Sequence, residues 1–224
     1  MMAARIRMKP GWKTYWRAPG GNGIPPIFDW SGSKNLKALR FHWPAPKVYM
    51  ENGYRTIGYT SDLVLPIEVT PHSKGQPVQV KGKVSFGICE DICLPVEARF
   101  SATLDGTVGF SDVIKSALAT RPLTGKKAGV RNVGCVIRPA SDGMAVTARL
   151  QLPGASATQF VVLEYSGGEV WAEQDQTQVQ GSRIIAGATL YPLSSAPLII
   201  DRSKLRLTVL GGANAVEIVG CPAG

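Results

Sequence analysis

The sequence predicts an all-β protein made of two β-sandwich domains, with a short helix near the junction between them. Apolar and polar residues alternate with a period of two in several segments, among them 63–69, 78–86, 144–150 and 205–209. Turn-forming residues separate these segments, and the totals of 25 glycines and 16 prolines suit many turns between short strands. Short strands at this spacing indicate sandwiches rather than a parallel sheet.

The first domain is expected at residues 1–120. Its strand at 12–17 places Trp12 and Trp16 on one face and residues such as Tyr15 on the other, since side chains alternate across a strand. This alternation predicts a half-buried strand near the start of the sandwich.

One helix is expected at 111–118. Ser111 can cap its first turn, and Asp112 places an acid in that turn. The segment 120–127 has few apolar residues and contains Pro and Gly, so we interpret it as a linker. The second domain is then expected at 128–224.

The net charge of +9 raises the question of a nucleic-acid or membrane-surface partner. The basic residues are scattered, and no Lys/Arg-rich helix, zinc-finger spacing or RNA-binding aromatic motif accompanies them. We therefore expect a solvated basic surface and no nucleic acid. The chain has no run of 18 apolar residues, and its start at Met1 lacks the regions of a signal peptide, so the compartment is argued from the cysteines.

The four cysteines are Cys89, Cys93, Cys135 and Cys221, an even number that suits an oxidising compartment. Three pairings are possible, and the positions favour one. A bridge from Cys135 to Cys221 closes roughly 87 residues and would contribute about 4.6 kcal/mol, whereas a bridge over about five residues contributes about 2 kcal/mol. Cys135–Cys221 is therefore expected to be structural, while Cys89 with Cys93 suits a reversible two-electron switch.

Cys89 and Cys93 are expected to face each other across a hairpin. Residues 84–89 and 93–98 form two strands, and Glu90, Asp91 and Ile92 form a three-residue loop between them. Residues opposed in this way have Cα atoms about 4.5 to 5.5 Å apart, within the reach of a disulfide.

The chemistry expected at this pair is direct thiol–disulfide exchange. The acids Glu90 and Asp91 would disfavour a thiolate, which makes the dithiol easier to oxidise and the reduced form an electron donor. Cys93 is the expected attacking sulfur, because the first residue after the loop is the less covered one. The sulfurs carry the electrons, so no cofactor and no metal are expected.

Two other uses of the cysteines stay open. Small β domains contain purely structural hairpin disulfides. A zinc site could also use the cysteines with His42 or His72, although CxxxC is looser than the usual CxxC and the second pair is not clustered.

The sequence resembles a known family in 11–17, 28–35, 63–66 and above all 84–95, which reads VSFGICEDICLP. These segments are similar to the N-terminal periplasmic domain of DsbD-type thiol:disulfide interchange proteins, and most of all to the branch called suppressor of copper sensitivity protein B (ScsB). The resemblance covers about residues 4–105. The second half is similar to the additional β domain of that branch through weaker motifs.

This resemblance implies immunoglobulin-like domains in the periplasm, with Cys89 and Cys93 as the two active cysteines. The chain would be the ectodomain of an inner-membrane protein. Electrons would arrive from its membrane and thioredoxin-like domains and pass to a soluble periplasmic thioredoxin-fold partner. The family has a longer cysteine spacing and an aromatic cap loop; here the corresponding stretch carries Glu51 and Tyr54 as the expected cap residues and has no Phe.

Two functions from different classes follow. The first is a protein-disulfide reductase domain, with a link to copper tolerance implied by the resemblance. The second is a non-catalytic periplasmic binding or assembly module stapled by two disulfides, since sandwiches host many functions. Reducibility of the Cys89–Cys93 pair distinguishes them.

Overall fold

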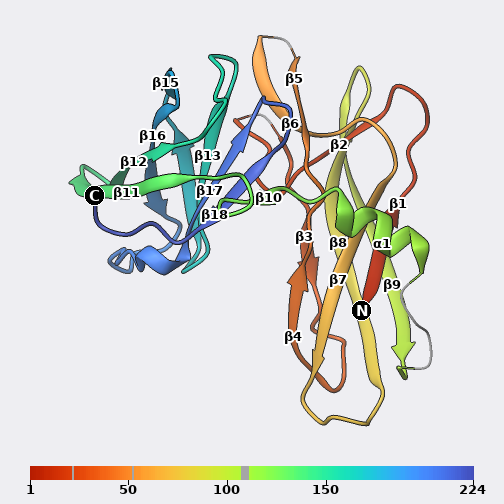
Figure 1. The fold of residues 1–224 in the computed structure, drawn as a ribbon. Helices are drawn as coiled ribbons and strands as arrows, with labels where there is room; N and C mark the ends of the chain where they lie inside the picture. Colours follow the sequence, from red (N-terminus) through yellow and green to blue (C-terminus); the bar gives the residue numbers. More distant parts are fainter. Residues whose placement is uncertain (22, 52, 107–110) are drawn as a thin grey trace. The chain divides into compact units, whose positions relative to one another are not determined.

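A computed structural model describes residues 1–21, 23–51, 53–106 and 111–224, with the side chains of Glu51 and Tyr54 also outside the description. The chain separates into two compact units, Met1–Arg121 and Pro122–Gly224. Each unit is a β-sandwich of two sheets, as Figure 1 shows. No helix in the described part is long and apolar enough to cross a membrane.

The strands of unit 1 all pair antiparallel. They are β1 (Met2–Ile6), β2 (Lys13–Tyr15), β3 (Ile27–Asp29), β4 (Leu36–Phe41), β5 (Lys47–Glu51), β6 (Tyr54–Tyr59), β7 (Leu63–Pro71), β8 (Val78–Cys89) and β9 (Cys93–Leu104). The smaller sheet has the order β1-β7-β4. The larger has the order β3-β8-β2-β6-β5, and β9 also pairs with β8.

The period-two pattern accounts for the core of unit 1. Leu63, Leu65 and Ile67 on β7 are buried, and so are Val78 and Val80 on β8. Alternate residues along each strand point to the same face of a sheet, so one face of each strand supplies the core. The expected all-β sandwich is confirmed.

Helix α1 (Asp112–Ala119) lies near the end of unit 1 and contacts β7. Its N-cap Ser111 accepts a hydrogen bond from the backbone N–H of Ile114 at 3.4 Å, which satisfies a donor that has no partner within the first turn. Ala117 is its buried residue. The capped helix expected near the domain junction is therefore confirmed.

Asp62, just before β7, is hydrogen-bonded to β1 and to the residues after it. Its carboxylate accepts hydrogen bonds of 3.1 Å from the Met8 backbone N–H and from the Arg5 guanidinium. These bonds, first that from Met8, lower the pKa of Asp62 below its ordinary value of 3.8. The ionised carboxylate thus fixes this turn at neutral pH.

Unit 2 is also a sandwich, and one short strand in it pairs parallel. Its elements are β10 (Leu123–Thr124), β11 (Arg131–Ala140), β12 (Gly143–Gln151), β13 (Phe160–Tyr165), β14 (Val170–Gln174), β15 (Gln178–Gln180), β16 (Arg183–Pro192), the 3-10 turn η1 (Arg202–Lys204), β17 (Leu205–Leu210) and β18 (Val216–Val219). One sheet has the order β10-β18-β17-β13 and the other β11-β12-β16-β14, with β15 beside β16. Buried aliphatic residues from both sheets form its core.

The segment 120–127, expected to be a linker, is folded into unit 2 from residue 122 onward. The backbone N–H of Leu123 donates to Ala215 at 2.8 Å, and that of Gly125 donates to Glu217 at 3.0 Å. These bonds make β10 the parallel neighbour of β18. Two strand residues are too few to show alternation, so composition alone suggested a linker.

Candidate functional site

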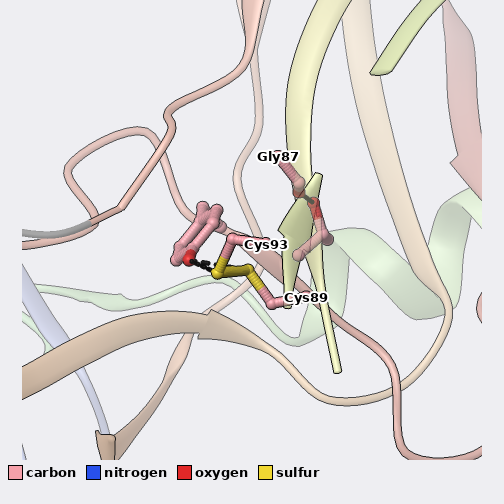
Figure 2. The surroundings of a disulfide bond; sticks show 5 residues. Gly87, Cys89 and Cys93 are labelled. Carbon is pink, nitrogen blue, oxygen red and sulfur yellow. Dashed lines mark hydrogen bonds between the residues drawn. A yellow bond between two sulfur atoms is a disulfide. The ribbon is translucent and has the colours of Figure 1, made fainter. Parts of the chain in front are cut away.

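The β8–β9 hairpin carries Cys89 and Cys93 at its closed end. The two strands are each 12 residues long and pair in unbroken register over their whole length. Residues 90–92 form the loop, and Cys89 lies directly opposite Cys93. The two Cα atoms are 4.1 Å apart, and a disulfide joins the residues (Figure 2). The juxtaposition expected from the hairpin pattern is confirmed.

The two cysteines differ in their exposure to solvent. Cys89 is only 1% exposed, because β8 has neighbours on both sides and Lys13 of β2 pairs with Cys89 across from β9. Cys93 is exposed, since among the described strands β9 pairs with β8 alone. Cys93 is therefore the cysteine of this bridge that solvent reaches.

Tyr15 on β2 contacts both sulfurs. Its hydroxyl oxygen lies 2.8 Å from Cys89 Sγ and 3.1 Å from Cys93 Sγ. The sulfurs of a disulfide carry no hydrogen, so the hydroxyl is the donor, with its single hydrogen shared between the two sulfurs. Tyr15 is 3% exposed. The bridge is thus exposed on one side and hydrogen-bonded to a buried phenol on the other.

Glycines make room for the Tyr15 ring. A Cβ atom on Gly87 would come within 2.8 Å of two ring carbons, and one on Gly23 would come within 2.9 Å of a third. The hydroxyl of the adjacent Thr14 donates to the Gly87 carbonyl at 2.8 Å, which fixes β2 against β8 (Figure 2). The position of the Tyr15 hydroxyl is therefore set by close packing and not by a free rotamer.

The sequence did not single out Tyr15. Tyr15 is separated from Cys89 by 74 positions and from Cys93 by 78, and no spacing rule connects a tyrosine to cysteines at that distance. The signal that could have found it is the predicted strand at 12–17, whose pairing with the cysteine strand brings Lys13 opposite Cys89.

The loop and its flanks combine acidic and apolar side chains. Glu90 and Asp91 are exposed, and the expectation that they disfavour a thiolate stays a prediction. Ile92 is 72% exposed and Leu94 is 45% exposed. Large apolar side chains in water on both sides of Cys93 are suited to contact with another protein.

Glu51 and Tyr54, the expected cap residues, pair with each other at the tip of the β5–β6 hairpin. This hairpin belongs to the sheet that contains the cysteines, because β6 pairs with β2. Their side chains lie outside the described residues, so a cap over the sulfurs stays a prediction.

Cys135 and Cys221 form the second disulfide, which spans 86 positions of the sequence in unit 2. Both are 1% exposed, and they form part of the hydrophobic core. The Arg202 guanidinium donates to the Cys135 carbonyl at 2.8 Å. Both cysteines of this bridge are enclosed, in contrast to the exposed Cys93.

The zinc alternative requires thiolates, and all four cysteines are bridged in this structure. His42 lies between Glu68, at 3.3 Å from Nε2, and Arg121, at 3.0 Å from Nδ1. His72 is exposed. Within the described ranges, no group of three or more His, Cys, Asp and Glu residues could hold a metal ion.

Comparisons with known proteins give this geometry a context. Residues 1–105 match the family described as the N-terminal domain of the thiol:disulfide interchange protein DsbD. The crystal structure of the N-terminal periplasmic domain of ScsB from Proteus mirabilis matches 99% of this chain and 86% of its own chain, with a TM-score of 0.67 and 21% identity, which shows a shared fold. No curated protein matches the chain. The segment that matches the family of DsbD N-terminal domains, residues 1–105, therefore contains the hairpin disulfide near its end.

Proposed function

We propose that unit 1 is a thiol:disulfide exchange domain in which Cys89 and Cys93 carry two electrons between proteins. The observation that supports this most is the asymmetry of the bridge: one cysteine is exposed on an edge strand, and the other is buried beside the Tyr15 hydroxyl. A bridge between residues only four positions apart adds about 2 kcal/mol through loop entropy, less than half of the about 4.6 kcal/mol expected for Cys135–Cys221, so its opening costs the fold less. The long β8–β9 ladder keeps the two sulfurs together when the bond is open.

In the proposed reaction the reduced pair donates electrons to a partner disulfide. The exposed Cys93 thiolate attacks one partner sulfur, the partner S–S bond breaks, and a mixed disulfide forms. The other partner sulfur leaves as a thiolate in this step. The Cys89 thiolate then attacks Cys93 Sγ, which restores the intramolecular bridge and releases the partner sulfur of the mixed disulfide as a second thiolate. Two electrons pass to the partner, and the protons equilibrate with solvent.

We infer the wider setting from the family. The chain is the periplasmic ectodomain of an inner-membrane protein, whose thioredoxin-like and membrane domains supply electrons. A soluble periplasmic thioredoxin-fold protein accepts them. Copper tolerance enters the proposal through the ScsB resemblance. Unit 2 serves as a second immunoglobulin-like domain, with Cys135–Cys221 as its structural bridge.

A redox titration tests the exchange proposal. The intact protein is equilibrated in dithiothreitol buffers, free thiols are trapped with a mass-tagged alkylating reagent, and the tags are located by mass spectrometry. We expect Cys89 and Cys93 to become reduced together in the range of exchange proteins, while Cys135 and Cys221 stay bridged as an internal control. If both bridges resist reduction equally, the protein is instead a binding or assembly module with two structural disulfides.

A further inference from the structure

The Tyr15 hydroxyl lies next to Cys89 Sγ. This sulfur is the leaving group when the bridge opens and the attacking group when the bridge closes. It donates to Cys89 Sγ at 2.8 Å and lies slightly farther, at 3.1 Å, from Cys93 Sγ. With the ring held against Gly23 and Gly87, the oxygen has little freedom to turn away. A buried phenol packed in this way is a fixed donor for whatever charge develops on the sulfur beside it.

The exchange reaction places a negative charge on Cys89. When an external thiolate attacks Cys93 Sγ, the bond to Cys89 breaks and its electron pair stays on Cys89 Sγ. Cys89 is 1% exposed, so water gives this thiolate little solvation. Burial disfavours the charged form of a thiol, whereas a hydrogen bond donated to that form favours it. Hydrogen bonds to charged groups are also stronger than those between neutral groups.

We propose that Tyr15 is a catalytic residue of the exchange site, donating a hydrogen bond that stabilises the thiolate of Cys89; this inference rests on the exchange function proposed above. In the reducing direction, a dithiol forms a bond with Cys93 while Cys89 leaves as a thiolate held by Tyr15. The second thiolate of the reductant then forms its own disulfide and releases the Cys93 thiolate. Tyr15 keeps its proton throughout, and Cys89 and Cys93 take theirs from solvent.

Other ionisable residues lie close to Cys89 in the sheet or in the sequence and must be held constant. Lys13 on β2 pairs with Cys89, and the loop carries Glu90 and Asp91. A change confined to one oxygen atom of Tyr15 leaves these groups in place, so the readout isolates the hydroxyl.

The test compares Tyr15→Phe with Tyr59→Phe. Tyr59 is a matched control, because it is a buried tyrosine on the neighbouring strand β6 whose hydroxyl donates to the Pro44 carbonyl at 2.9 Å and not to sulfur. Burial raises the pKa of Tyr59 above its ordinary value, so it does not titrate with the thiols. Each variant is made in the otherwise unchanged chain and again together with Cys93→Ala, which leaves Cys89 as the one free thiol.

Two measurements follow. The ultraviolet absorbance of the thiolate gives the titration midpoint of Cys89, and stopped-flow mixing with dithiothreitol gives the rate at which the bridge opens. For Tyr15→Phe we expect the midpoint to rise by about one pH unit, a tenfold change in acid dissociation, and the rate to fall roughly three- to tenfold. Tyr59→Phe should change neither quantity. Unchanged values for Tyr15→Phe, or equal changes in both variants, would overturn the proposal.

A second variant covers the case in which Tyr15→Phe does not fold. Replacement of Tyr15 by 3-fluorotyrosine keeps the hydroxyl and makes it a stronger donor. We expect the Cys89 midpoint to move downward, and no movement or an upward one would contradict the inference. If the Cys89–Cys93 bridge of the unchanged protein resists dithiothreitol as firmly as Cys135–Cys221, the exchange function itself fails. If that bridge opens readily while the Tyr15 variants leave the midpoint unchanged, only the role of Tyr15 fails.

Discussion

Removal of each disulfide should have unequal effects on the two units. The Cys135–Cys221 bridge spans 86 positions and the Cys89–Cys93 bridge spans four. Loop entropy then gives losses of about 4.6 and about 2 kcal/mol for the Cys→Ala double variants. The first loss approaches the whole stability of a typical domain, roughly 5–15 kcal/mol. At a urea m-value of about 2 kcal/mol per M, the unfolding midpoints should fall by about 2.3 M in unit 2 and about 1 M in unit 1.

Hydrogen exchange with mass spectrometry in rising urea measures this difference, because it reads each unit separately. Peptides from β7 report on unit 1 and peptides from β16 report on unit 2. Each double variant is the control for the other, since it should leave the peptides of the opposite unit unchanged. Equal falls in the two unfolding midpoints, or a larger fall in the Cys89–Cys93 variant, would refute the assignment of Cys135–Cys221 as structural and Cys89–Cys93 as redox-active.

Three further predictions concern access, docking and pH. In the Cys89→Ala variant, iodoacetamide should alkylate Cys93 at least about tenfold faster than it alkylates Cys89 in the Cys93→Ala variant. Similar rates would contradict the difference in exposure between the two cysteines. Replacing Ile92 and Leu94 by Ser should lower kcat/KM toward an oxidised thioredoxin-fold protein roughly tenfold, while the rate with dithiothreitol stays unchanged; loss with both substrates would argue against docking. The lowered pKa of Asp62 implies stabilisation that is present above pH 3.8 and is lost as pH falls through the lowered value. The hydrogen-exchange protection factors of the β1 amides should therefore decrease in that pH range. Asp62→Asn should abolish this pH dependence.

The hairpin could be predicted because its information is local. Alternation along 84–89 and 93–98 fixes which residues share a face, and a three-residue loop fixes which residues lie opposite. The pairing of Cys89 with Cys93 follows from those two facts. The structure lengthens both strands without changing their register. The capped helix was predictable for the same reason, since Ser111 and the residues it caps are adjacent in sequence.

Features that depend on distant pairing were not predictable from local patterns. The Tyr15 hydroxyl meets the sulfurs only because β2 and β8 are neighbours in the sheet. Likewise, β10 exists only because it pairs with β18, about 90 positions later. The predicted alternation of 12–17 into two unlike faces is also incomplete, because Thr14, Tyr15 and Trp16 are all buried. When both faces of a strand are covered, the residues on the two faces do not differ in burial.

The features that limit the contribution of the Cys89–Cys93 bridge to stability also favour its reversible opening and closing. A disulfide stabilises a fold mainly by constraining the unfolded chain, and a bridge over four positions constrains it by only about 2 kcal/mol. In the folded protein the β8–β9 ladder holds the two residues opposite each other. Opening the bond therefore changes the unfolded ensemble little and leaves the thiols opposed in the folded one. Reclosure then resembles an intramolecular reaction between groups already held together, which favours fast resolution of a mixed disulfide. The bridge of unit 2 differs in two respects, since its cysteines are 86 positions apart in the sequence and both are only 1% exposed, so solvent does not reach it. These properties suit Cys89–Cys93 to redox exchange and Cys135–Cys221 to a permanent structural role.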